Sequence, residues 1–336
     1  MATPQPLSVT VMPLETRRDA ILHLAARADA LGYQAFALPE TWSHDAMLIL
    51  TEAALRTQNI RLLAGILGVW GRSAAHIAMA SATLNEISHG RFMLGLGAST
   101  PQLTEGLHDV AYETPHKKLR QTLTQVRALL NGERIPLTRP TETRSLRLNY
   151  APQPELPILV AAASPKSIQL AGELGDGWLP FLFPKDRLAE SIALFREGAA
   201  RSDNPQKPRQ ICPSIPAAVH EDAAIARKGA AWFVAFYLMM MGPIYQNTLV
   251  RLGYKREVEA VLAANAGQKP ALVPPEAENL LEQLTIYGTP EQARTQLAGW
   301  YEAGADMLGL VLGPNLSHEA IDFTLEAFRP EPASAD

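Results

Sequence analysis

Ser164 and its neighbours are residues whose types and spacing could bind an anion. Ser164 follows the apolar run 157–163, and the next residue, Pro165, is favoured at the first position of a helix. The free N–H groups at such a helix start attract anions, and the side chains of Lys166 and Ser167 could add hydrogen-bond donors. The segment therefore predicts an anion site, with a plain helix cap as the alternative.

Glu40 and His44 are the candidates for acid/base chemistry. Glu40 follows the apolar run 35–39, and His44 lies four residues further on. A carboxylate can orient a bound molecule, and the pKa of histidine suits proton transfer near neutral pH. A solvated acid and an ordinary core or surface histidine are the alternatives for these two positions.

Motifs typical of several other enzyme classes are missing. The eight histidines and the single cysteine show no metal-binding spacing, so no metal site is expected. There is no G-x-S-x-G elbow and no phosphate-binding loop of the G-x-x-x-x-G-K-[ST] type. Gly95 and Gly97 follow a strand pattern, but Thr100 stands where a dinucleotide fingerprint needs its third glycine. We interpret these glycines as a tight turn between a strand and a loop.

The composition is that of a folded protein with a large core. The chain has 336 residues, 47% of them hydrophobic and 19% charged, and its formal net charge is −4. This charge gives no basis for a nucleic-acid or anionic-membrane partner. The only cysteine, Cys212, cannot form an intrachain disulfide, and the first residues lack the pattern of a signal peptide. We therefore expect a cytoplasmic protein.

Eight short apolar runs alternate with longer amphipathic ones. Helical spacing is clearest over 15–32 and 289–304, where a glycine ends each pattern. Strands separated by helices imply a parallel sheet, and eight is the number at which such a sheet closes into a (β/α)8 barrel. An open doubly wound sheet would show the same alternation. The predicted strands cover residues 7–12, 35–39, 60–66, 91–97, 157–163, 177–181, 211–219 and 306–312.

Two segments interrupt this alternation within a single expected domain, residues 1–329. Residues 132–155 are rich in Arg, Thr and Pro and predict a loop excursion, and residues 330–336 predict a frayed tail. Residues 221–285 are too long for one crossover and predict two or three helices over one end of the barrel. They include the uncharged run 229–250, which Gly and Pro interrupt, so we expect a buried or pocket-covering segment rather than a membrane span.

Three parts of the chain resemble the bacterial luciferase-like superfamily of flavin- and F420-dependent oxidoreductases. The first is residues 61–99, where ATLNEISHGRFMLGLG at 82–97 matches the family run with few departures. The second, residues 157–178, is similar to F420-dependent methylene-tetrahydromethanopterin reductases. The third is residues 236–254 together with 286–306. The resemblance implies a TIM barrel, a homodimer, and a cofactor at the carboxyl ends of the strands.

The family pattern also implies which residues touch the cofactor. A cis peptide bond at Gly65–Ile66 would lie under the ring, the Ala163–Ser167 loop would hold the phosphate, and Glu40 would bond to or orient the cofactor. The residues implied are Glu40, Gly65, Ile66, Gly68, Gly97, Ala98, Ser99, Ala163, Ser164, Lys166 and Ser167.

The resemblance implies hydride transfer between coenzyme F420 and a small organic substrate. The alternatives are an FMN-dependent monooxygenase and a catalytically silent cofactor-binding homologue. F420-dependent sugar-phosphate dehydrogenases carry a catalytic His and Glu where this chain has Thr41 and Thr100, so we do not expect alcohol oxidation by their scheme. Phe236, Tyr237 and the methionines at 239–241 would form an adaptable apolar cover, with an ordinary helix core as the alternative for the methionines.

Overall fold

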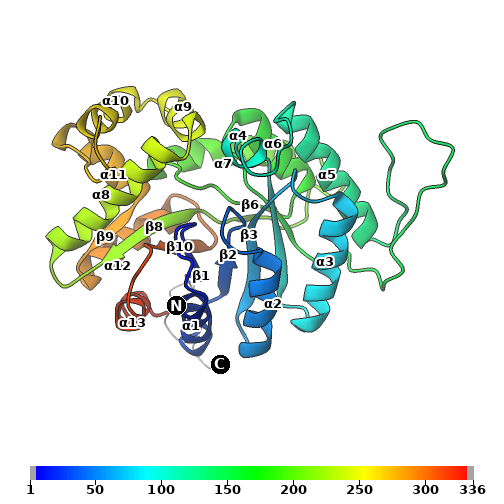
Figure 1. Cartoon of the computed structure of the whole chain (residues 1–336), viewed down its shortest axis with the longest axis horizontal. Coiled ribbons are helices and arrows are strands. Elements are labelled where there is room, and N and C mark those ends of the chain that lie inside the picture. The colour runs from blue at the N-terminus through cyan, green and yellow to red at the C-terminus, as the bar shows by residue number, and fades with distance from the viewer. Residues whose placement is uncertain (1–4, 331–336) are drawn as a thin grey trace.

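Parallel strands form a ring that helices surround (Figure 1). The computed structural model describes residues 5–330, so the predicted tail beyond Pro330 lies outside the described residues. The strands are β1 (Leu7–Val11), β2 (Ala35–Leu38), β3 (Arg61–Gly68), β4 (Phe92–Gly97), β5 (Ile158–Val160), β6 (Gly177–Trp178), β7 (Gln210–Ile211), β8 (Ser214–Val219), β9 (Ile286–Gly288) and β10 (Leu308–Leu312).

The segment that contains β7 and β8 closes the ring. β7 pairs with β6, whereas β8 pairs with β10 on the opposite side. The backbone N–H groups of Cys212 and Ser214 donate to the carbonyls of Trp178 and Pro180, at 2.8 and 2.9 Å. Each predicted strand run contributes one position to this ring, so the predicted barrel is confirmed and the open sheet is excluded. β9 was not predicted; it adds to the outer edge of β8.

Helices connect the strands and begin where the sequence carries capping residues. Ser164 and Thr289 each accept a hydrogen bond from the backbone N–H three residues later, and a proline follows each of them, as predicted. The helices are α1 (Arg18–Ala30), α2 (Ala46–Arg56), α3 (Ala74–Ile87), α4 (Pro101–Thr104), α5 (Pro115–Leu130), α6 (Pro165–Leu174), α7 (Leu188–Ala199), α8 (Ala223–Met240), α9 (Pro243–Arg251), α10 (Lys255–Ala264), α11 (Glu278–Leu284), α12 (Pro290–Glu302) and α13 (His318–Ala327), with 3-10 turns η1 (Lys185–Arg187) and η2 (Pro275–Ala277).

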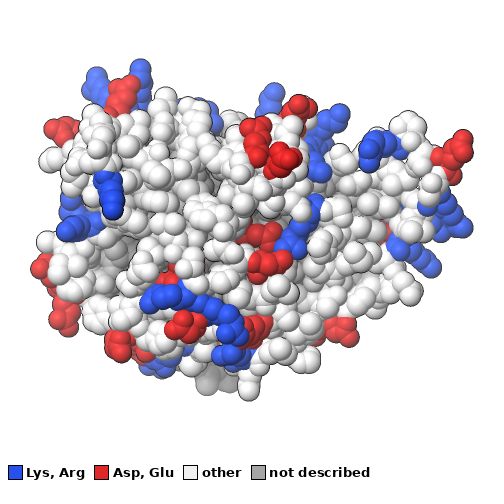
Figure 2. Space-filling model, viewed as in Figure 1, with Lys and Arg blue, Asp and Glu red and all other residues white. Residues whose placement is uncertain are grey.

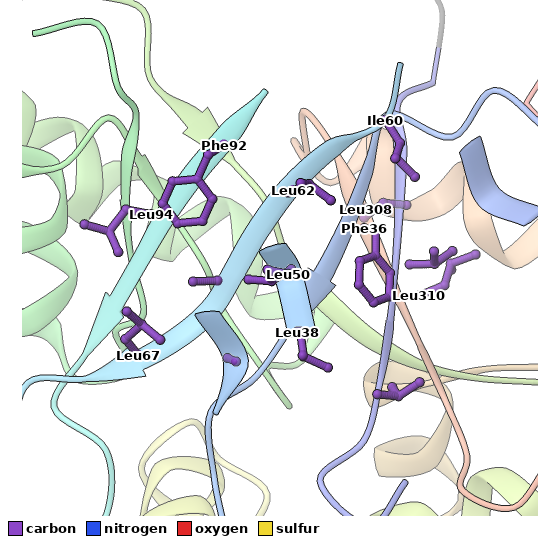
Figure 3. Close-up of a cluster of buried hydrophobic side chains, with 14 of the residues drawn as sticks. Phe36, Leu38, Leu50, Ile60, Leu62, Leu67, Phe92, Leu94, Leu308 and Leu310 are labelled. Carbon is purple, nitrogen blue, oxygen red and sulfur yellow. The ribbon is translucent and has the colours of Figure 1, made fainter. Parts of the chain in front are cut away.

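Side chains alternate in direction along each strand and so form two hydrophobic layers, one under the helices and one inside the barrel. In β2, Phe36 and Leu38 point outward and pack under the helices, in the cluster that Figure 3 shows. Ala35 and Ala37 point inward and share the barrel interior with Cys212. Because side chains alternate between the two faces of a strand, both layers exclude water and hold the strand ends in fixed positions.

The segment after β8 packs as a unit over one side of the barrel mouth (Figure 1). It holds four α-helices, α8 to α11, rather than the predicted two or three, because Gly242 and Gly253 both adopt positive φ and end a helix. α8 is apolar and long enough to cross a membrane by length and composition alone; half of it is buried in the protein, as in a core helix. The predicted excursion forms a long loop without helix or strand on the opposite side.

Candidate active site

A cavity of about 490 Å³ opens at the carboxyl ends of the strands. Its floor comes from residues at the ends of β1 to β5, and its roof comes from α8 and α9. Nine of the residues predicted to touch a cofactor line it: Glu40, Gly65, Ile66, Gly97, Ala98, Ser99, Ala163, Ser164 and Ser167.

One wall of the cavity is a bulge in β3. The Gly65–Ile66 peptide bond is cis, as predicted. The pairing of β3 with β4 shifts by one residue between Ala64 and Leu67, and the carbonyl of Ile66 accepts the backbone N–H of Glu40 at 3.1 Å. The bulge thus presents the side chain of Ile66 to the cavity beside Gly97.

The two glycines of β4 make room for this bulge. A Cβ on Gly95 would lie 2.1 Å from the carbonyl oxygen of Ala64, and a Cβ on Gly97 would lie 2.3 Å from Cδ1 of Ile66. The spacing of these glycines predicts a tight turn after the strand. The structure gives a different reason, since both lie within β4 and allow β3 to approach closely.

Two aromatic side chains hold the backbone of the loop after β4 through hydrogen bonds. The indole N–H of Trp70 donates to the carbonyl of Ala98 at 2.8 Å, and the hydroxyl of Tyr112 donates to the carbonyl of Ser99 at 3.2 Å. Ser99 itself has a φ of 61°, which is uncommon for a residue other than glycine. These contacts hold the backbone of the loop against the cavity.

The start of α6 forms the opposite end of the cavity. Ser164 and Ser167 cap the helix through reciprocal hydrogen bonds and both line the cavity. Arg251, at the end of α9, also lines it and donates to the carbonyl of Ala163 at 2.6 Å. Arg251 therefore lies beside a helix start whose capping bonds already use the N–H groups of Ser164 and Ser167, and its positive charge together with the helix dipole suits a phosphate. The sequence analysis missed Arg251, because it lies 88 residues from its partner.

Glu40 lines the cavity, but both oxygens of its carboxylate already accept hydrogen bonds from Arg72. Arg72 donates to Oε1 at 3.0 Å and to Oε2 at 2.6 Å, and it also reaches Asp45 at 2.6 Å. The hydrogen bond to Glu40 is the largest of the contacts that raise the pKa of Arg72. Burial raises the pKa of Asp45, but the hydrogen bond and charge of Arg72 and the backbone N–H groups of Leu48 and Met47 together outweigh it, so the net pKa is lowered. Glu40 is thus suited to orient a ligand rather than to exchange protons.

Three predicted site residues lie outside the cavity lining. The chain turns away after β2, so that Nε2 of His44 lies 3.0 Å from the carbonyl oxygen of Thr16; this position offers no acid/base group to a ligand in the cavity. Gly68 lies behind Ser99, and the Lys166 side chain points to solvent. Beside the start of α6, Arg251 rather than Lys166 is therefore the cationic side chain that lines the cavity.

The two departures from the dehydrogenase pattern both lie at the cavity. Thr41 Oγ1 is buried without a hydrogen-bond partner in the described part of the chain. Thr100 Oγ1 accepts the N–H of Leu103 and so caps α4. Neither threonine can act as a carboxylic acid or an imidazole, which fits the expectation that the acid/base scheme of the sugar-phosphate dehydrogenases does not apply.

The roof of the cavity is aromatic and aliphatic. Tyr237 from α8, Met241 just after it, and Ile244 and Tyr245 from α9 line it, and Phe181 packs against the two tyrosine rings. Of the residues expected in an apolar cover, Tyr237 and Met241 line the cavity, whereas Met240 points to solvent because it lies on the outer face of α8.

The chain matches a family model described as luciferase-like monooxygenase over residues 3–307. One relative, from Mycobacterium tuberculosis, is named as a candidate coenzyme F420-dependent oxidoreductase; it is 29% identical over 316 residues, which cover 86% of this chain and 90% of the relative. Another is the 5,10-methylenetetrahydromethanopterin reductase of Methanolobus tindarius, 26% identical over 306 residues that cover 88% and 91% of the two chains.

A solved structure with the same fold is the coenzyme F420-dependent tetrahydromethanopterin reductase of Methanopyrus kandleri. It superposes with a TM-score of 0.77 at 20% identity, over 96% of this chain and 97% of that one. At this level of identity the likeness shows the fold alone. It agrees with the barrel that the hydrogen bonds of the present chain form.

Proposed function

Since the chain belongs to the luciferase-like monooxygenase family, as its match over residues 3–307 shows, we propose that it is an F420-dependent oxidoreductase. It transfers a hydride between the deazaflavin and a small organic substrate. The support for F420 over other cofactors comes from the mycobacterial and archaeal relatives, which are named for F420 or for a reductase of this class.

The observation that carries the proposal is that one cavity joins two distinct features. Ile66, on the cis-peptide bulge, offers an apolar wall for a flat ring, and Gly97 beside it has no Cβ that would fill the space. The start of α6 with Arg251 offers the positive end of a helix dipole and a positive side chain for a phosphate. A molecule with a flat ring at one end and a phosphate at the other fits both features, and the residues present are therefore suited to a deazaflavin or flavin nucleotide.

The residues of this chain would bind and orient, while the cofactor would supply the hydride chemistry. Arg251, Ser164 and Ser167 would hold the phosphate, and Ile66 would support the ring. Glu40, fixed by Arg72, would accept a hydrogen bond from a polar edge of the ring. The roof formed by α8 and α9 would exclude water and so keep the reacting atoms in a medium of low polarity.

FMN is the competing cofactor, because it also joins a tricyclic ring to a phosphate and because the family is named for monooxygenases. F420 lacks the ring nitrogen at which flavins support oxygen chemistry, so the cofactor decides the reaction. A silent homologue would bind a cofactor and turn nothing over. The three possibilities differ in which cofactor binds and in whether a candidate acceptor oxidises the reduced form.

Titration of the purified protein with F420 and with FMN tests the proposal. We expect F420 to bind at least tenfold more tightly. Arg251→Ala should weaken F420 binding by roughly 10- to 100-fold, the usual effect of removing a charge-assisted hydrogen bond. Binding of the phosphate-free deazaflavin nucleoside should not change, because it lacks the group that Arg251 contacts.

The matched control is Arg256→Ala, which removes an exposed positive charge from the same helical segment, outside the cavity lining. This variant should bind F420 as the wild type does. Equal weakening by both variants, or weaker binding of the phosphate-free compound to Arg251→Ala, would contradict the assignment of Arg251. Preferential binding of FMN would replace the proposed function by the monooxygenase alternative.

A further inference from the structure

Two tyrosines in the roof differ from most other tyrosines of the protein in the hydrogen bonding of their hydroxyls. The hydroxyls of Tyr237 and Tyr245 have no hydrogen-bond partner within residues 5–330, although both side chains line the cavity. Five other tyrosines donate to a defined acceptor: Tyr33 to Leu325, Tyr112 to Ser99, Tyr254 to Asp186, Tyr287 to Glu278 and Tyr301 to Pro6. Among the described residues Tyr150 also has an unpaired hydroxyl, but it lies outside the cavity lining, so Tyr237 and Tyr245 are distinguished by combining an unpaired hydroxyl with a position at the cavity.

Packing holds both rings in place. The rings of Tyr237 and Tyr245 meet edge to face, with their centroids 5.3 Å apart at an angle of 89°. Phe181 packs edge to face against both, at 4.9 and 5.9 Å, and Phe233 stacks on Tyr237 at 4.9 Å. Only 3% of the surface of Tyr237 is exposed. The two phenols thus have little freedom to seek partners elsewhere, and a ligand that meets them finds them already ordered.

Both hydroxyls are donors under physiological conditions. Burial raises the pKa of Tyr237 and of Tyr245, and the proximity of Tyr245 raises that of Tyr237 further. Each phenol therefore keeps its proton at neutral pH. Both hydroxyls are at the cavity, so an acceptor atom of a molecule bound there, between apolar walls, would be favoured at this place.

The surroundings restrict what that molecule can be. Phe181, Met241 and Ile244 give this part of the cavity apolar walls. The carboxylate of Glu40 is bonded to Arg72, and Arg251 lies at the phosphate end beside Ala163. A charged substrate would find no free counter-charge among these groups, and burying it there would be unfavourable. An uncharged, apolar molecule with an oxygen acceptor suits the walls and the two donors together.

We propose that Tyr237 and Tyr245 donate hydrogen bonds to the carbonyl oxygen of an otherwise apolar substrate, such as a ketone or an enone. A carbonyl oxygen has two lone pairs and no proton of its own, so it can accept from both phenols at once. The two bonds would draw electron density towards the oxygen and make the substrate carbon a better acceptor of a hydride from reduced F420; the resulting alkoxide or enolate would then take up one proton from water. This inference rests on the proposed function, because it supposes a cofactor ring on the floor of the same cavity.

The test uses the full-length protein and four variants: Tyr237→Phe, Tyr245→Phe, the double variant, and Tyr254→Phe as the matched control. Tyr254 lies in the same helical segment, but its hydroxyl bonds to Asp186 outside the cavity lining. F420 titration of each protein comes first and reports on the proposed function alone, since the phenols are not assigned to the cofactor. Thermal unfolding of each variant checks that it is folded.

Calorimetric titration of the F420-loaded proteins with cyclohex-2-enone and with cyclohexene then tests the phenols. We expect the wild type to prefer the enone. Each phenylalanine variant in the roof should weaken enone binding by about tenfold, the typical effect of one lost hydrogen bond, and leave cyclohexene binding unchanged. Tyr254→Phe should behave as the wild type. The enone affinity should also stay constant between pH 6 and 9, because neither phenol ionises there.

Two results would overturn the inference while leaving the proposed function intact: an F420-loaded wild type without preference for the enone, or roof variants that lose affinity for both probes equally. Absence of F420 binding to the wild type would instead contradict the proposed function itself.

Discussion

At the scale of single residues, the bulge in β3 and the glycines of β4 depend on one another. Gly95 and Gly97 both face β3, but the atoms that a methyl group would meet are different. At Gly95 it would meet the backbone of Ala64, and at Gly97 it would meet the end of the Ile66 side chain. Backbone cannot move aside, whereas a side-chain end can, so the two substitutions should have separate consequences.

Gly95→Ala should lower the free energy of unfolding by about 1–3 kcal/mol or prevent folding, as overpacking does. Gly97→Ala should fold but displace Ile66 and weaken cofactor binding by about tenfold, equivalent to about 1.4 kcal/mol. Urea denaturation and cofactor titration measure the two effects.

Adding Ile66→Val to Gly97→Ala removes Cδ1, the atom nearest to the new methyl group, and should restore most of the cofactor affinity. If the double variant binds the cofactor less tightly than Gly97→Ala alone, Ile66 does not act through this contact.

At the scale of elements, Asp176 ties several segments together at the entry to β6. Its carboxylate accepts the N–H of Ile158 at 2.8 Å, contacts Lys207 at 2.7 Å, and pairs with Arg127 of α5. Burial raises the pKa of Asp176, but the charge of Arg127 and the hydrogen bonds from Lys207 and Ile158 outweigh it, so the pKa is lower than usual. The folded protein therefore holds this carboxylate in its charged form.

A lowered pKa in the folded state gives stabilisation that is present above the unfolded value, about 3.9 for aspartate, and is lost as the pH falls through the folded value. Asp176→Asn should therefore lower the free energy of unfolding by about 1–3 kcal/mol at pH 7. The difference from wild type should shrink below about pH 4. Urea denaturation at a series of pH values measures it.

Glu259→Gln, which removes one member of an exposed pair with Lys255 on α10, is the control and should change stability little at any pH. A difference between Asp176→Asn and wild type that stays constant from pH 7 to pH 3 would contradict this account.

At the scale of the whole molecule, one outer face carries large apolar side chains that are exposed and are not part of the hydrophobic core. Leu48 and Leu55 of α2 are 71% and 74% exposed and lie two helical turns apart, and Met79 on the neighbouring helix α3 is 50% exposed. On the face that Figure 2 shows, basic and acidic side chains form separate small groups on a mostly uncharged surface. We propose that a second copy of this chain covers the apolar face, as the family resemblance implies.

Changing both Leu48 and Leu55 to glutamate should convert a dimer into a monomer, because the charges would be buried against a partner. Light scattering after size-exclusion chromatography measures the mass. Leu146→Glu is the control, since Leu146 is 72% exposed but lies in the long loop on another part of the surface. A wild type that is monomeric, or a double variant that stays dimeric, would contradict the proposal.

The sequence by itself determined the elements and their order. Hydrophobic periodicity and caps such as Ser164 and Thr289 depend on residues only a few positions apart, so they can be recognised without knowing the fold. Alternation of strands and helices left a barrel or an open sheet possible, and the family resemblance implied the barrel and the cis bond at Gly65–Ile66. What it did not provide was the short strand β9, which has three residues and no alternation to detect.

The tertiary structure alone decided which side chains meet in the cavity. Arg251 reaches Ala163 across 88 residues, and Arg72 occupies the carboxylate of Glu40 across 32. Such contacts depend on how helices pack over the strand ends, and no local pattern specifies that packing. The same is true of the free hydroxyls of Tyr237 and Tyr245. The sequence of an apolar helix does not show whether the hydroxyl of one of its tyrosines is hydrogen-bonded or faces a cavity. The position of the neighbouring backbone determines which of the two occurs.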